Sequence, residues 1–379
     1  MTMQADRDRM LRDFLELTQL DSVSFRERKL ADRLKDKLLK LGFEVHEDTA
    51  GNHYDSETGN IYGRLPADGT GGRPVLFSAH MDTVEPGLGK QPEYDREKGV
   101  IRSRTNTVLG ADDVCGITEI LEGIRIAAVE KESHGEIEVL FTIAEEQYGK
   151  GAKVFDMSRI QSSDVYVLDM SGTPGKAANK APSIISFTAD IYGKAAHAGF
   201  NPQNGIHAVG VAASAVARIP LGKITENTTL NIGTIQGGTE DNIVPEHCRV
   251  TGECRSFCHE EALQEVDNVQ RIFGEAATAA GAQIRFQKTV QIKAYETPAD
   301  AAVCRDFTAA CARLGLAGEL VSTHGGSDNN IFSERDLQGI VLSCGMFSTH
   351  SIEEYARLDD MVSGAQLVAE IIRERRYGS

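Results

Sequence analysis

Three features are missing from this 379-residue sequence, and each absence excludes a class of protein. No run of 18 apolar residues is present, so no segment is predicted to span a bilayer. Basic residues are few: 40 Lys and Arg stand against 56 Asp and Glu, for a net charge of -16. That deficit argues against nucleic acid or an anionic membrane as the main partner. The seven cysteines are odd in number and form no C-x-x-C pair, which predicts neither a disulfide framework nor a zinc knuckle.

The beginning of the sequence lacks an apolar signal segment, because residues 1–9 are polar and charged. A cytoplasmic location is therefore the expectation. A hydrophobic fraction of 41% with 25% charged residues is typical of globular proteins, and the length allows two or three domains.

Short β-rich runs alternate with longer helical patterns over most of the chain. Apolar residues spaced three and four apart predict two opening helices, and Gly42 ends the second. The main predicted strands are residues 75–79, 137–143, 165–168 and 340–343, and later helices are predicted over 114–129 and 361–373. This alternation predicts an α/β fold with a mostly parallel central sheet.

A block with a different pattern interrupts this alternation. Residues 183–293 read in the order β-α-β-β-α-β, which is the ferredoxin-like unit and folds as a small domain of its own. The sequence therefore predicts a discontinuous α/β domain of residues 1–182 and 294–379, with an α+β domain inserted at 183–293.

Acidic residues and histidines form five clusters where predicted strands should end, one of them just before the helix predicted over 114–129. Open α/β sheets place their ligands in this region. The clusters are His80 with Asp82, Asp112 with Asp113, Glu145 with Glu146, Asp169, and His350. Each has an ordinary explanation when it is taken alone. Asp112 is a suitable N-cap, Asp169 suits a turn, and a single histidine such as His350 more often has a structural role.

Taken together, these residues offer two imidazoles and several carboxylates, a set that suits two divalent ions sharing one carboxylate. His80, Asp112, Glu146, Asp169 and His350 meet that requirement. Glu145 is then free to act as a general base on the attacking water. Asp82, two residues beyond His80 on the same side of the strand, is expected to orient the His80 imidazole from behind.

Several segments, in order, resemble those of the M20 zinc metallopeptidases, and among these the peptidase T (tripeptide aminopeptidase) branch. The matching segments are Ser78 to Val84, Leu109 to Asp113, Ala144 to Glu146, Asp169, Gly193 to Gly199, Gly326 to Asp328, and the His350 region. They extend over nearly the whole chain. The resemblance implies a catalytic α/β domain with a ferredoxin-like lid that usually dimerises, so a homodimer is expected.

The resemblance also implies a role for each metal ligand. His80, Asp112 and Asp169 would hold one ion, while Asp112, Glu146 and His350 would hold the other. The expected metal is Zn²⁺, with Co²⁺ or Mn²⁺ as alternatives. Where the family commonly has a lysine and a small residue after the two aspartates, this chain has Val114 and Cys115.

Substrate-binding residues are expected from the resemblance as well. His197 resembles the family's oxyanion-assisting histidine, whereas Asn242 and Arg255 resemble groups that hold the substrate backbone or carboxylate. An arginine suits a carboxylate because its planar fork donates two parallel hydrogen bonds. Gly326, Ser327 and Asp328 would form a substrate-facing loop. Local chemistry alone would make His197 an ordinary loop residue, Arg255 a surface residue and the 326–328 segment a turn.

The function expected from the sequence and the resemblance is a cytoplasmic dizinc aminopeptidase that acts on short peptides and releases the N-terminal residue of tripeptides. In this family an aspartate at the position of Asp169 is typical of aminopeptidases and dipeptidases. The alternatives are an M20 amidohydrolase, deacylase or carboxypeptidase using the same ions, and an inactive metal-binding scaffold. Glu145 argues against the scaffold, because a carboxylate with no ligand duty has no structural reason to accompany Glu146.

Overall fold

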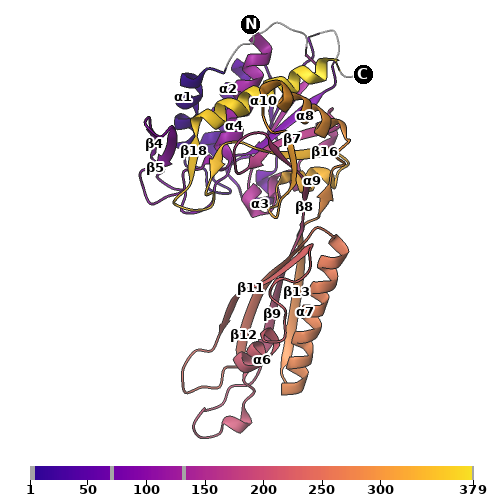
Figure 1. Cartoon of the computed structure of the whole chain (residues 1–379). Helices are drawn as coiled ribbons and strands as arrows, with labels where there is room; N and C mark the ends of the chain where they lie inside the picture. Colours follow the sequence, from indigo (N-terminus) through magenta and orange to yellow (C-terminus); the bar gives the residue numbers. More distant parts are fainter. Residues whose placement is uncertain (1–4, 69–71, 130–133, 378–379) are drawn as a thin grey trace. The chain divides into compact units, whose positions relative to one another are not determined.

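A computed structural model of the chain describes residues 5–68, 72–129 and 134–377. Its contacts divide the chain into two compact units, coloured along the sequence in Figure 1. The large unit consists of Met1–Lys180, Glu296–Thr323 and Ser327–Ser379. The small unit consists of Ala181–Tyr295 and His324–Gly326.

A nine-stranded sheet forms the centre of the large unit. Its strands are β1 (Glu44–Glu47), β2 (Ile61–Leu65), β3 (Val75–His80), β6 (Ile137–Thr142), β7 (Asp164–Met170), β8 (Lys176–Ala181), β14 (Tyr295–Glu296), β15 (Glu319–Ser322) and β16 (Gln338–Ser343). They follow the order β1-β2-β6-β3-β7-β16-β8-β14, with β15 paired to β8. The four neighbours β6, β3, β7 and β16 are parallel, so the predicted mostly parallel α/β sheet is confirmed.

The central strands are apolar because both of their faces are covered, as expected for parallel sheets. Every residue of β3 and β6 is buried, and the rings of Phe77 and Tyr166 stack with their centroids 5.7 Å apart. The helices of this unit are α1 (Arg7–Thr18), α2 (Arg28–Lys40), α3 (Gly51–Tyr54), α4 (Ala111–Val129), α5 (Lys150–Val154), α8 (Ala302–Leu314), α9 (Asp328–Ser333) and α10 (Leu358–Tyr377).

Helices α4 and α10 approach each other closely, and a glycine permits this contact. A Cβ added to Gly123 of α4 would lie 2.5 Å from the Cβ of Val368 on α10. Helix α4 also packs on β3 and β7, which fixes the position of its first turn beside the ends of these strands.

A second, smaller sheet in the large unit was not predicted from the sequence. It has the order β17-β18-β5-β4 and consists of β4 (Pro92–Asp95), β5 (Val100–Ser103), β17 (Met346–Phe347) and β18 (Tyr355–Arg357). The rings of Phe347 and Tyr355 stack at 5.0 Å, and the Arg102 guanidinium lies 4.4 Å from the centre of the Tyr355 ring. These contacts fix the hairpin that carries His350.

The small unit consists of an antiparallel sheet and two helices, which together form one hydrophobic core. The strands are β9 (Ser183–Tyr192), β10 (Gly222–Lys223), β11 (Thr228–Gly237), β12 (His247–Ser256) and β13 (Gln283–Ile292), and the helices are α6 (Ala208–Val216) and α7 (His259–Ala280). Figure 1 shows the four long strands beside α6 and α7. The order β10-β11-β12-β9-β13 contains the four-stranded arrangement expected of a ferredoxin-like unit, with the two-residue β10 added at one edge.

Alternate residues of β9, among them Ile185, Phe187 and Ile191, are buried against these helices. This period of two is the pattern of a strand with one covered face. In the part of the chain that the structure describes, no helix has the length and apolar character needed to cross a membrane.

Candidate metal centre

The parallel register of the large sheet brings its polar strand ends together. His80 is the last residue of β3 and pairs with Thr142, the last residue of β6. A single-turn 3-10 helix, Glu145–Gln147, follows β6 directly, and Asp169 lies near the end of the neighbouring strand β7. The side chains predicted to hold metal therefore meet at one edge of the sheet.

Asp112 occupies the middle of this cluster. Its Oδ1 lies 2.9 Å from Nε2 of His80, and its Oδ2 lies 3.3 Å from Nε2 of His350. The two oxygens of one carboxylate thus face two different imidazoles. This is the arrangement required of a carboxylate that contributes to two neighbouring sites.

Each imidazole also has a second carboxylate beside it. Asp169 Oδ1 lies 3.7 Å from Nε2 of His80, and Glu146 Oε1 lies 2.8 Å from Nε2 of His350. The result is two triads that share Asp112. One contains His80 and Asp169, while the other contains Glu146 and His350.

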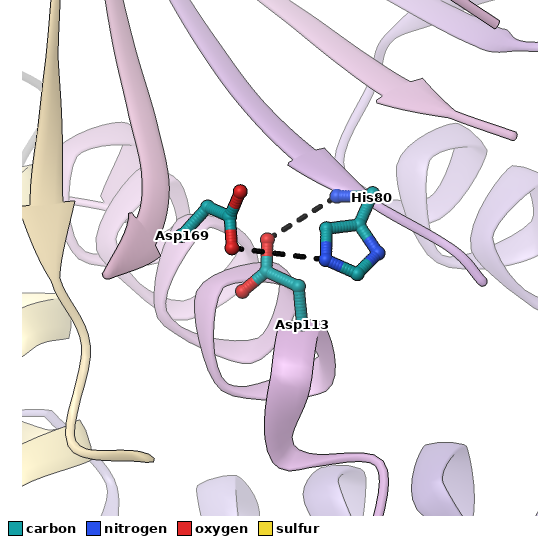
Figure 2. Close-up of side chains that lie close together, drawn as sticks. All are labelled: His80, Asp113 and Asp169. Carbon is teal, nitrogen blue, oxygen red and sulfur yellow. Dashed lines mark hydrogen bonds and ion pairs between the residues drawn. The ribbon is translucent and has the colours of Figure 1, made fainter. Parts of the chain in front are cut away.

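Asp113 enters the same cluster, although the sequence analysis assigned it no role. Figure 2 shows its carboxylate beside His80 and Asp169, and a ring nitrogen of His80 and one carboxylate oxygen from each aspartate lie within 4.8 Å of one another. Both Asp113 oxygens already accept backbone hydrogen bonds, Oδ2 from His80 at 3.2 Å and Oδ1 from Gly116 at 3.2 Å. Asp113 therefore joins β3 to the first turn of α4.

Asp82 lies beside the His80 ring, on its Nδ1 side. The nearest acceptor for Nδ1 of His80 is the main-chain oxygen of Asp82, at 2.9 Å, whereas the Asp82 carboxylate lies 3.4 Å away. That carboxylate accepts hydrogen bonds from the backbone amides of Glu145, at 2.8 Å, and Glu146, at 3.3 Å. Ser24 Oγ donates a further hydrogen bond to it at 2.7 Å. Asp82 therefore also holds the segment that carries the predicted base.

The electrostatics of the cluster reflect many carboxylates in a small buried volume. Burial raises the pKa of Asp169 to about 7, in spite of its contact with His80. Burial, followed by repulsion from Asp169, raises the pKa of Glu145 well above its usual value. Hydrogen bonds to Asp112 and then Glu146 raise the pKa of His350 to about 10. A set of buried carboxylates and imidazoles is suited to divalent cations, which would favour the ionised carboxylates and the neutral imidazoles.

The predicted substrate residues of the small unit form two separate groups. Asn242 and His197 lie close together, since the amide of Ala198 donates to the Asn242 carbonyl at 2.9 Å and His197 forms a β-bridge with Ile243. His197 comes five residues after the end of β9, at Tyr192, and Asn242 comes five residues before the start of β12, at His247, which pairs with Tyr192. Arg255 lies eight positions further along the same strand, roughly 26 Å away at about 3.3 Å per residue. A tripeptide is at most about 11 Å long, which is shorter than this separation along the backbone.

His197 and Arg255 each have contacts within the small unit. Nδ1 of His197 accepts hydrogen bonds from the amides of Gly199 and Phe200, and its ring packs against Phe200 at 4.3 Å. The guanidinium of Arg255 donates to Glu253 at 2.7 Å and to the carbonyl of His324 at 2.9 Å.

The predicted substrate-facing loop is engaged in packing. A Cβ on Gly326 would lie 2.2 Å from Cδ1 of Ile292. Ser327 caps α9 by accepting a hydrogen bond from the amide of Asn329. Asp328 is buried and accepts a hydrogen bond from Thr142 Oγ1 at 2.5 Å, so its carboxylate lies under the end of β6.

Two further buried glutamates contact the segments of the site, and sequence reasoning missed both. Glu27 accepts a hydrogen bond from the amide of Ala144 at 3.0 Å, just before the Glu145 and Glu146 pair. Glu354 accepts from the amides of Gly110 and Asp112.

Comparison with known proteins gives two family matches. Residues 179–280 match the peptidase dimerisation domain of the M20 family, and residues 60–212 match peptidase family M28. The second range contains the segments of β3, α4, β6 and β7 that carry His80, Asp112, Glu146 and Asp169.

Full-length relatives extend the comparison. The uncharacterised protein YqjE of Bacillus subtilis strain 168 is 35% identical over 367 residues, covering 97% of this chain and 98% of the relative. The crystal structure of aminopeptidase PepT from Bacillus cereus ATCC 10987 is 34% identical, with a TM-score of 0.90 over 98% of this chain and 99% of that chain. A tripeptidase from Staphylococcus aureus subsp. aureus Mu50 is 29% identical, with a TM-score of 0.94 over the same shares.

Proposed function

The chain belongs to the M20 peptidase family, and from this premise we propose that it is a two-metal aminopeptidase that removes the N-terminal residue of short peptides, tripeptides above all. The observation that carries the proposal is the position of Asp112. Its two oxygens face His80 and His350, and a second carboxylate accompanies each imidazole.

The donor set of the cluster fits two divalent ions. His80, Asp112 and Asp169 would hold one ion, and Asp112, Glu146 and His350 the other. Imidazole and carboxylate donors are those that Zn²⁺ takes in catalytic sites, with Co²⁺ and Mn²⁺ as alternatives. When bound, such ions polarise a carbonyl oxygen and lower the pKa of water toward neutrality.

Glu145 is proposed as the general base. The two proposed triads do not include Glu145. Among the described residues, it is also absent from the two compact groups of potential ligand atoms, His80 with Asp113 and Asp169, and His80 with Asp112 and Glu146. Its backbone amide is held by Asp82, which fixes the start of its side chain beside the triads. From there its carboxylate would take a proton from the attacking water and return it to the leaving nitrogen.

The direction of cleavage is assigned to the amino end. The aminopeptidase and the tripeptidase among the similar structures support this choice, as does aspartate at position 169. A free α-amino group is a cation, and a cluster rich in carboxylates favours its binding. Deacylases and carboxypeptidases do not need that group, which separates the alternatives experimentally.

The small unit is proposed to join two copies of the chain and to supply substrate contacts. Its match to a peptidase dimerisation domain supports the first role. For the second role, the separation along the backbone between His197 with Asn242 and Arg255 exceeds the length of a tripeptide. In a homodimer, the two groups that serve one peptide would come from different copies.

The proposal is tested with a set of matched tripeptides, given to the purified protein loaded in turn with Zn²⁺, Co²⁺ and Mn²⁺. The set contains a free tripeptide, its N-acetyl form and its C-terminal amide, and the products are identified by mass spectrometry. We expect release of the N-terminal residue from the free and amidated peptides, and little reaction of the acetylated one. Faster hydrolysis of acetylated peptides or N-acyl amino acids would assign the protein to the amidohydrolases instead.

A further inference from the structure

The hairpin formed by β17 and β18 brings two side chains to the metal centre, His350 and Glu354. Of these, only His350 is proposed as a metal ligand. His350 lies in the turn between the strands and faces the Asp112 carboxylate. Glu354 directly precedes β18, and only 2% of it is exposed. Its carboxylate points to the backbone of the segment that carries Asp112.

The contacts of Glu354 are specific. Its Oε2 accepts a hydrogen bond from the amide of Gly110 at 2.8 Å, and its Oε1 accepts one from the amide of Asp112 at 3.0 Å. The single carboxylate thus accepts hydrogen bonds from the residues on both sides of Ala111, the first residue of α4. Amide groups at the beginning of a helix have no acceptor within the helix, and they are usually satisfied by a side chain close in sequence. Here the acceptor comes from 242 residues away.

The segment that Glu354 holds is not regular helix. Asp112 has φ -83° and ψ 97°, outside helical values, so the hydrogen bonds of α4 do not fix its backbone. Gly110 has φ +78°, which favours glycine, and a Cβ there would lie 3.0 Å from Nζ of the buried Lys90. External hydrogen bonds are therefore needed to keep Asp112 in this conformation.

We infer that Glu354 is a positioning residue that fixes the backbone of Asp112, so that both carboxylate oxygens face the two imidazoles. The inference rests on the proposed two-metal centre. Glu354 acts through Asp112. The same hairpin contacts that aspartate twice, because His350 faces its carboxylate and Glu354 accepts a hydrogen bond from its backbone amide. Because Asp112 is the shared residue, loss of Glu354 affects both sites together. Groups that orient a metal ligand typically change metal affinity or activity by about 10- to 100-fold.

The test compares Glu354→Ala and Glu354→Gln with Glu353→Ala, the matched control. Glu353 is the exposed neighbour on the same hairpin, and its replacement by alanine removes the same charge. Metal affinity is measured by competition with a chelator, in the absence of peptide, and the visible spectrum of the Co²⁺-loaded protein reports the coordination of both ions. We expect Glu354→Ala to weaken both ions by 10- to 100-fold and to change the Co²⁺ spectrum, while Glu353→Ala matches wild type.

Glu354→Gln keeps one acceptor oxygen but turns an NH₂ group toward the other amide, so its affinities should lie between those of wild type and Glu354→Ala. This variant also decides the matter if the alanine variant does not fold. Weakening of one ion alone, or unchanged affinities in both Glu354 variants, would overturn the inference. Since no peptide is used, a protein that binds two ions but cleaves no peptide would refute the proposed activity and still allow this test.

Discussion

The two units of this protein hold their polar side chains in contrasting ways. At the sheet edge of the large unit, the candidate ligands are mostly buried, and backbone hydrogen bonds to Asp82, Asp113 and Glu354 fix the segments that carry them. In the small unit, His197 and Asn242 are exposed and lie outside the strands, beyond the His247 end of β12, while Arg255 lies near the other end of that strand. The first group is fixed by contacts within the fold, whereas the second is proposed to be completed by a substrate and another copy of the chain. Mutations should therefore separate metal binding from substrate binding.

The largest effect is expected from Asp112→Ala, because this change removes a ligand from both triads. Bound ions supply several kcal/mol of transition-state stabilisation, so activity should fall by on the order of 10³-fold or more. Metal content by mass spectrometry should show both ions lost together. His80→Ala and His350→Ala are the comparison variants, and each should lose one ion first. Two ions bound at normal affinity in Asp112→Ala would show that the shared residue is misassigned.

Glu145→Gln is expected to come next, with a loss of on the order of 10² to 10⁴-fold in kcat. The amide cannot take a proton, yet it has the shape of the carboxylate, so both ions should remain bound. Glu146→Gln, the variant of its neighbour, should instead weaken the ion beside His350. Rates and metal content measured on the same samples distinguish the two. Full activity in Glu145→Gln would remove the proposed base.

Asp82→Ala should have an intermediate effect, because it removes the acceptor for the amides of Glu145 and Glu146 without removing a ligand. We expect a decrease of about 10- to 100-fold in activity or metal affinity. Ser24→Ala is the matched control, since it deletes one donor to Asp82 and leaves both amide contacts in place. Its steady-state kinetics should stay close to wild type. Equal losses in the two variants would mean that Ser24, and not the amide contacts, carries the effect.

The smallest effect is expected for His197→Ala and Arg255→Ala, which should lower kcat/KM and leave metal content unchanged. If the two groups serve one peptide from different copies, unfolding and refolding the two variants together should form mixed dimers with one intact site. Activity of the mixture should then exceed that of either variant refolded alone. A mixture no more active than its components would argue that the groups do not act on the same peptide.

Much of the fold could be predicted from the sequence, because apolar periodicity determines which faces are buried. The central strands and the β-α-β-β-α-β order of the small unit follow this pattern closely. The small sheet did not, because two of its strands have only two or three residues, too few for a period to be seen. Helix α4 begins at Ala111, three residues before its predicted start, since Asp112 and Asp113 break the apolar pattern.

The meeting of His80, Asp112, Glu146, Asp169 and His350 could be anticipated, because parallel strands end at the same edge of a sheet. Their separate roles stay predictions. The residues that hold the backbone of these ligands in place could not be predicted from the sequence. Glu354 and Asp112 are 242 residues apart, and nothing local distinguishes Glu354 from the exposed Glu353 beside it. The distance between His197 and Arg255 likewise depends on the register of β12, which no motif encodes.

The central claim is that the sheet edge holds two cooperating ions, and a metal titration tests it most directly. Metal-free protein is titrated with Zn²⁺ or Co²⁺, and bound ions per chain are measured alongside the rate of hydrolysis of a free tripeptide. The account predicts two bound ions per chain and a rate that reaches its maximum only as the second is bound. One bound ion at full activity, or activity that does not depend on added metal, would contradict it.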